Sequence, residues 1–179
     1  QPERPGVTLR EMVERGCFIH CSAGLIRRAC LDRVGMFDET MSRVKDFDLW
    51  MRIARHDKLA YLDDVLATYT QHDRNMTHDH LAGARGNLQA IQHVAPLAAA
   101  GVTWWLLRRR RAELHYRVAR LAWDAAQYRL AATHFAWATW EWPVIGARAR
   151  GHEASWGQRA VGLLKPLAGD QRAQVGDQE

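Results

Sequence analysis

The sequence predicts an α/β segment followed by an α-helical region. In the first part, runs rich in β-forming residues at 17–26 and 59–70 alternate with short stretches of helical periodicity. Further along the chain, apolar residues recur every three or four positions, which is typical of amphipathic helices. We therefore expect an α/β part at 1–78, a helical part at 79–145 and a poorly ordered tail at 146–179.

The first part is expected to open with two short helices around one strand. Residues 7–15 have helical spacing and end at Gly16, a natural C-cap. Residues 17–26 are apolar and contain several β-forming residues, which indicates a buried strand. A second short helix is expected at 27–34, and Gly35 supplies the residue that tolerates positive φ after it.

The next helix of the first part is amphipathic and carries two carboxylates. Asp46 and Asp48 stand at or near its N-terminus, where unpaired backbone N–H groups and the helix dipole favour negative charge. On spacing alone we favour an N-cap, which contributes about 1 kcal/mol. Strands are expected after this helix at 59–62 and 65–70, with residues 63–64 in the turn.

A tryptophan pair stands beside a run of arginines in the helical part. A helix is expected over 79–94, before Pro96. The eleven residues 97–107 are apolar, include Trp104 and Trp105, and precede four arginines. Such a run is too short to cross a bilayer, which needs about 20 residues. Two interpretations stay open: the tryptophans pack on the first part of the chain, which we favour, or they lie at a membrane surface.

Small and aromatic residues recur over 112–143. Five of them have a common spacing: Tyr128, Ala131, Phe135, Ala138 and Pro143. With Ala119 and Ala122 before them, they resemble one tetratricopeptide helix pair, in which small residues let two helices approach closely. Ala126 stands where that pattern has Gly. Because a single repeat leaves one face uncovered, the pair is expected to pack on the rest of the chain, another repeat or a partner.

Charge and cysteine content limit the classes of protein to which the chain can belong. The net charge is +5 with a pI near 9.5, which suits phosphate-bearing ligands, nucleic acid or an anionic membrane without choosing among them. Three cysteines argue against a disulfide framework and fit a reducing compartment. Cys17, His20 and Cys21 are a poor match to a zinc site because no second ligand pair has the required spacing. We expect a cytoplasmic protein, with the inner face of the membrane as a second location to consider.

A series of weak motifs follows in a specific order. It runs from an apolar stretch ending in Arg27-Arg28, through Gly35 and Phe37-Asp38-Glu39, to the Asp46 helix with Leu49-Trp50, a hairpin-like pair over 61–69 and His72. This order resembles the C-terminal half of the catalytic domain of family 2 glycosyltransferases, which have the GT-A fold. The resemblance covers residues 16–77, about a third of the chain.

The resemblance implies an activity and assigns residues to it. Family 2 enzymes move a sugar from a nucleotide-diphosphate donor to an acceptor hydroxyl, usually with inversion, and Asp46 matches their general base. His72 matches a position that approaches the diphosphate or its divalent metal, Mn or Mg, which is expected only in the complete enzyme. Lys45, Asp48 and Trp50 complete the expected substrate site, the last two more as supports of the helix and its wall than as direct ligands. The implied partners are a nucleotide-sugar and a glycan or lipid-linked acceptor.

Two departures from the family pattern qualify this assignment. Lys45 stands where the family has an acidic residue, and an adjacent cation would lower the pKa of Asp46 and weaken it as a base. No Asp-x-Asp lies upstream of Asp46, so the chain is expected to lack the half that binds the nucleotide. The alternative is a non-catalytic interaction module, in which residues 79–143 dock a protein or a membrane surface. Nucleic-acid binding is not expected, because Glu113 and Asp124 interrupt the arginine-rich stretch.

Overall fold

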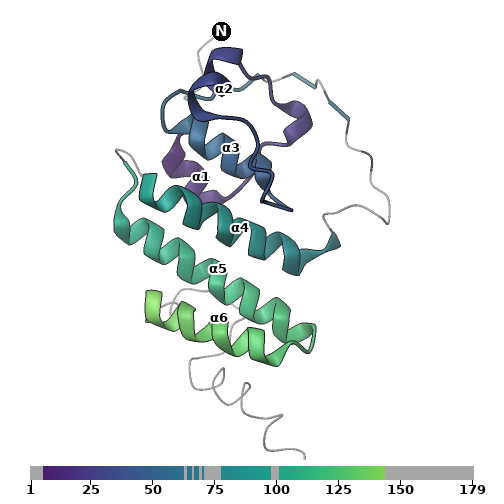
Figure 1. Ribbon diagram of the computed structural model, residues 1–179, viewed down its shortest axis with the longest axis vertical. Helices are drawn as coiled ribbons and strands as arrows, with labels where there is room; N and C mark the ends of the chain where they lie inside the picture. Colours follow the sequence, from purple (N-terminus) through teal and green to yellow (C-terminus); the bar gives the residue numbers. More distant parts are fainter. Residues whose placement is uncertain are drawn as a thin grey trace, which may run out of the picture.

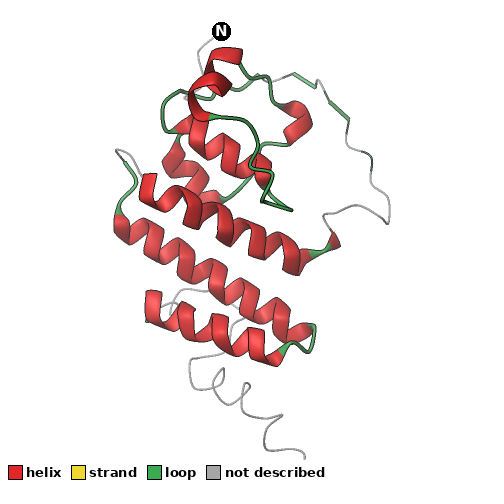
Figure 2. Cartoon of the chain, in the orientation of Figure 1, coloured by secondary structure: helices red, strands yellow, loops and turns green. Residues whose placement is uncertain are grey.

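The computed structural model describes residues 6–62, 64, 65, 67, 68, 70, 78–97 and 101–143, in which helices are joined by loops and turns (Figures 1 and 2). The α-helices are α1 (Leu9–Arg15), α2 (Arg28–Val34), α3 (Lys45–Ala54), α4 (His80–Val94), α5 (Trp104–Asp124) and α6 (Tyr128–Glu141). Short 3₁₀ turns occur at Cys21–Ala23 (η1) and Ala95–Leu97 (η3). Helices α4, α5 and α6 lie side by side in successive layers, and α1, α2 and α3 gather on the other side of α4.

Local signals end these helices where the sequence predicts. Thr8 forms a capping box with Glu11 at the start of α1, and Gly16 ends that helix with φ 87°. Gly35 ends α2 with φ 81°, a conformation that glycine adopts at no steric cost. At α4, the Asp79 side chain accepts a hydrogen bond from Ala82 N at 2.9 Å. The expected helices at 7–15, 27–34 and 79–94 are therefore confirmed within one or two residues.

The hydrophobic core lies between α3 and its neighbours. Its largest fully buried apolar side chains come from α1, the loop before α3, α3, α4 and α5: Met12, Val13, Met41, Phe47, Leu49, Met51, Ile91, Val94, Leu114 and Val118. Helix α3 contributes the most residues to the core cluster around it, namely Phe47, Leu49, Trp50, Met51 and Ile53. The core therefore holds the start of α3 in place.

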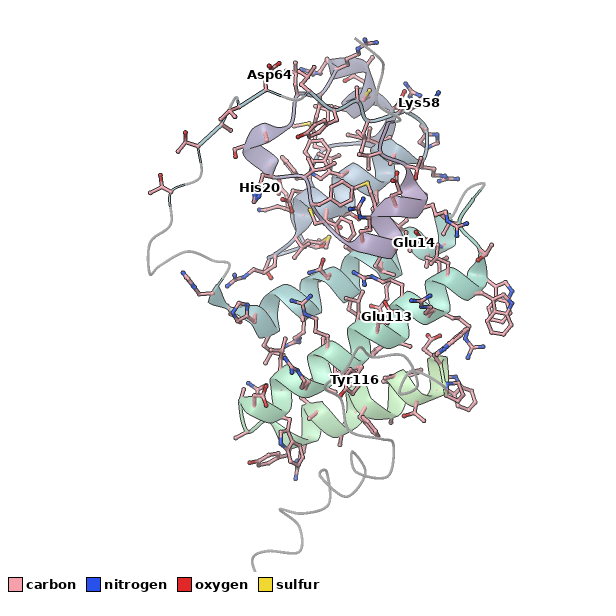
Figure 3. All side chains as sticks on the ribbon, turned by 180° about the vertical axis from the view of Figure 1, so that it is seen from behind. Glu14, His20, Lys58, Asp64, Glu113 and Tyr116 are labelled. Atoms are coloured by element: carbon pink, nitrogen blue, oxygen red, sulfur yellow. The ribbon has the colours of Figure 1, made fainter. Side chains whose placement is uncertain are left out.

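The predicted α/β class is wrong for the part of the chain that the structure describes, because that part contains no strand (Figure 2). Residues 17–26 form a loop with one 3₁₀ turn, and Leu59 makes a single antiparallel bridge to Val7. Val65, expected within a strand, is 99% exposed, and Figure 3 shows Asp64 on the same extended segment, outside the helical layers. A β-forming segment needs a neighbouring strand for its N–H and C=O groups, and the described residues supply only the Val7–Leu59 bridge.

Helices α5 and α6 form the close pair that the small residues predict. They run side by side and are joined by a tight turn in which Ala126 has φ 57°, at the position where the tetratricopeptide pattern has Gly. Ala119, Ala122, Ala131 and Ala138 are buried. The opposite side of α5 packs on α4, so the pair covers one of its faces with the rest of the chain.

No helix among the described residues is long and apolar enough to cross a membrane. The expected tail at 146–179, the proposed turn residue Asp63 and the whole of 71–77 lie outside the described residues.

Candidate functional site

Asp46 lies in the first turn of α3, with its carboxylate partly exposed. Its Oδ1 accepts a hydrogen bond from Phe47 N at 2.9 Å, and the next four residues of the helix are all buried. Asp46 is therefore not the N-cap. That position belongs to Val44, whose side chain makes no capping bond. The carboxylate stands at the surface on a helix that the core fixes.

The turn before Asp46 has a strained backbone. Val44 has φ 60° and ψ 22°, the left-handed conformation, which is an outlier for a β-branched residue and costs roughly 1–3 kcal/mol. Gly86 of α4 faces this turn, and a Cβ there would stand 2.7 Å from Val44 Cγ2. Arg43 Nη2 also lies 3.3 Å from Asp79 Oδ2 at the start of α4. Helix α4 thus fixes the residues that lead into Asp46.

Asp48 is buried and holds an ion pair inside the protein. Its Oδ2 accepts a hydrogen bond from Arg52 Nε at 2.8 Å. Arg52 in turn donates to the carbonyl oxygens of Val34 and Met36, at 2.8 Å for Met36. Asp48 therefore joins α3 to the end of α2 and has no exposed oxygen to offer a substrate.

His93 brings a third element to this ion pair. Its Nδ1 lies 3.4 Å from Asp48 Oδ1 and 3.5 Å from Asp38 Oδ2. The pKa of Asp38 is lowered, mainly by hydrogen bonds from Thr40 and to a smaller degree by His93. The sequence signals the Asp48–Arg52 pair through its four-residue spacing, but no sequence pattern connects His93 to it.

Trp50 is buried beneath the loop that replaces the expected first strand. A Cβ on Gly24 would stand 2.3 Å from Trp50 Cη2, so the indole lies directly against the Gly24 backbone. Its Nε1 is buried without a hydrogen-bond partner among the described residues. Trp50 belongs to the core here and does not line an open surface.

Cys17 is the neighbour of Asp46 that the sequence does not indicate. Burial of its thiol and the nearby Asp46 carboxylate raise the pKa of Cys17 to about 11, although much of the residue is exposed. The Sγ donates a weak hydrogen bond to the Ile19 carbonyl at 3.4 Å. Cys17 is consequently a protonated thiol at neutral pH and a poor nucleophile.

Lys45 is exposed beside Asp46, whereas His72, the expected metal ligand, lies outside the described residues. Within the residues that the structure describes, no three His, Cys, Asp or Glu side chains gather closely enough to hold a metal ion. The Cys17, His20 and Cys21 set is included in that finding.

No protein-family model matches the chain, and no curated protein or solved structure matches it either.

Proposed function

We propose that this chain supplies the acceptor side of a glycosyltransferase that uses a nucleotide-diphosphate sugar, with Asp46 as the general base. The observation that supports this most is the position of Asp46, a partly exposed residue at the head of a helix whose next five residues are buried. The order of the motifs around it, from Arg27 to His72, is the second support. A base on a rigid helix keeps its position while substrates come and go.

The proposed reaction is an in-line displacement at the anomeric carbon. The acceptor oxygen forms a bond to this carbon as the bond to the leaving diphosphate breaks, and the hydroxyl proton passes to a carboxylate oxygen of Asp46. A carboxylate serves as the base because the hydroxyl becomes acidic in the transition state. A divalent metal, for which His72 is the candidate ligand, would supply positive charge for the leaving diphosphate. Lys45, exposed next to Asp46, offers a further cation for the phosphates.

Asp48 and Trp50 act in this proposal by positioning Asp46. Asp48 holds α3 to the end of α2 through Arg52, and Trp50 fixes the loop at Gly24 against the same helix. Neither side chain is exposed to a substrate in the structure. Substitution of Asp48 or Trp50 should therefore lower both the melting temperature and the turnover, whereas substitution of Asp46 should lower the turnover alone.

The test is glycosyl transfer by the product of the complete gene, with a panel of uridine and guanosine diphosphate sugars and release of the nucleotide as the readout. Asn accepts the Phe47 N–H bond but takes no proton, so Asp46→Asn should keep its melting temperature and lose roughly 10²–10⁴ in kcat. Glu39→Gln is the control, because Glu39 is an exposed carboxylate in the preceding loop. Unchanged turnover in Asp46→Asn would remove the general-base assignment.

The 179-residue chain by itself should bind nucleotide sugars weakly, because it contains no Asp-x-Asp upstream of Asp46. Isothermal titration calorimetry with the same donors and manganese measures this. Micromolar affinity would contradict the acceptor-side assignment and place the donor site within these residues.

A second candidate function is a non-catalytic interaction module. The outer face of α6 favours it, since Trp140 is 74% exposed there. No helix among the described residues covers that face. Absence of transfer with every donor, together with intact folding of the gene product, would favour this module over the transferase.

A further inference from the structure

Three tryptophans meet at the end of the α5–α6 pair where α5 begins and α6 ends. Trp104 and Trp105 stack with their ring centres 4.0 Å apart, and Trp142 meets Trp105 edge-on at 5.5 Å. The Arg108 guanidinium lies over the Trp104 ring at 5.4 Å. We call this group, together with Arg109, the tryptophan–arginine cluster.

The cluster is half-exposed, whereas the interpretation that the sequence favours has the tryptophans packed on the first part of the chain. Trp104 is 54% exposed and Trp105 is 53% exposed. The residues that do enter the core at this end of α5 are Leu107, which is buried, and Leu106, which is partly buried. The α5 helix is thus anchored by its leucines and leaves two indoles at the surface.

Positive charge is in excess along the first half of α5, which carries these indoles. Glu141 pairs with Arg108 and Arg111, and Glu113 pairs with Arg109 and Arg110 (Glu113 is labelled on α5 in Figure 3). Four guanidinium groups therefore share two carboxylates, and among the four the Arg109 side chain is the most exposed, at 60%. The first turn of α5 contains no acidic residue, and its helix dipole adds partial positive charge at the same end.

We propose that the tryptophan–arginine cluster docks this chain on the surface of a bilayer that contains anionic phospholipid. Indoles prefer the boundary between lipid headgroups and acyl chains, where the ring is apolar and the N–H remains hydrated. Arginines beside them reach phosphates with paired N–H donors while their stems cover apolar surface. An excess of guanidinium over carboxylate complements a negatively charged leaflet. The inference is independent of the proposed transferase.

The ring contacts favour lipid over single-stranded nucleic acid, which also binds aromatic and basic surfaces. A base needs an open indole face on which to stack. The Trp104 ring is already stacked on Trp105 and covered by Arg108, and Trp105 also meets Trp142. A bilayer can accept the ring edges that remain exposed.

The experiment is flotation of the chain with phosphatidylcholine vesicles, with and without phosphatidylglycerol, at low and high salt. Binding is expected only to the anionic vesicles, with weakening at high salt and a blue shift of tryptophan emission. The double variant Trp104→Ala/Trp105→Ala should lose most of the binding. Arg109→Gln should lower the partition coefficient about fivefold, the equivalent of roughly 1 kcal/mol per basic residue near such a surface.

The controls come from the opposite end of the helix pair. Tyr128 is 49% exposed and packs on Trp123, so Tyr128→Ala matches the loss of a half-exposed aromatic residue. Arg120 is an exposed arginine further along α5 and matches Arg109. Both controls should bind vesicles as the unsubstituted chain does. Circular dichroism melts verify that all variants remain folded.

Several results would overturn the proposal. These are absence of binding to anionic vesicles, equal losses in Arg109→Gln and Arg120→Gln, and binding that Trp104→Ala/Trp105→Ala leaves intact. Self-association that this double variant abolishes, without vesicle binding, would assign the cluster to contact between copies of the chain. Tight binding of a single-stranded RNA that outcompetes vesicles would assign it to nucleic acid.

Discussion

Removing the Arg52 guanidinium should destabilise the protein strongly. Asp48 is buried, and its Oδ2 is held by Arg52 Nε at 2.8 Å. Among the described residues its Oδ1 has no hydrogen-bond partner, and His93 Nδ1 lies 3.4 Å from it. Arg52→Met keeps most of the apolar stem but leaves the carboxylate without its main counter-charge. Breaking a buried pair in this way costs about 3–5 kcal/mol. Since 17% of the Arg52 side chain is exposed, we expect the lower end, about 3 kcal/mol.

The assay is urea denaturation followed by circular dichroism, with the free energy of unfolding extrapolated to water. A loss of 3 kcal/mol also corresponds to a fall in Tm of roughly 6–12 °C for a chain of this length. Arg28→Met is the matched control, because Arg28 Nε forms a pair with Asp32 Oδ1 over the same four-residue spacing but at an exposed site. Exposed helix pairs contribute about 0.3–0.5 kcal/mol, so the control should change little.

A double-mutant cycle isolates the interaction itself. Asp48→Asn removes the buried charge, and the combination with Arg52→Met should cost less than the two single losses together, by about 0.5–3 kcal/mol. Additive losses would mean that the two side chains do not interact in solution. A loss in Arg52→Met no larger than that in Arg28→Met would mean that Asp48 is solvated and that the buried pair is absent.

Two further predictions concern α4 and the α5–α6 interface. Gly86→Ala should lower the free energy of unfolding, measured by urea denaturation, by about 1–3 kcal/mol because the new Cβ would strike Val44. Gly83→Ala is the control: a Cβ there meets nothing within 4 Å, so helix propensity should raise the free energy of unfolding by up to about 1 kcal/mol. Equal effects of the two substitutions would refute the contact between Gly86 and Val44. Burial, with a smaller effect from His134, lowers the pKa of His115 to about 4, while an unfolded histidine has its ordinary value near 6.5. As the pH is lowered, the unfolded chain therefore takes up the proton first. The free energy of unfolding should fall by about 1.4 kcal/mol for each unit by which the pH is lowered from roughly 6.5 to 4. His115→Gln should remove that part of the slope, and an unchanged slope would show that His115 is exposed or already charged.

Most of the helical architecture could be predicted from the sequence because its signals are local. Gly16 and Gly35 end helices at φ 87° and 81°, and Asp79 caps α4 through its own side chain. Each of these devices acts within one turn of helix, so neighbouring residues suffice to reveal it. Ala126 is similar, since the turn between α5 and α6 needs positive φ whichever residue occupies it.

The strands could not be predicted in the same way, because a strand is not a local structure. Residues 17–26 and 59–62 have suitable composition, yet each needs a partner that pairs with its backbone along its length. In the described chain only Leu59 finds one, at Val7, and the apolar side chains of Tyr61 and Leu62 remain exposed. Composition therefore indicated where strands could form without deciding that they would.

The same distinction between local and tertiary determinants applies to the candidate site. Sequence alone determined that Asp46 and Asp48 stand in the first turn of one amphipathic helix, because helical spacing depends only on nearby residues. Only the tertiary structure decided that Asp46 stays partly exposed while Asp48 is buried against Arg52 and His93. Burial depends on what packs over a helix, and here α4 and the end of α2, which come from distant parts of the chain, enclose Asp48 and leave Asp46 at the surface.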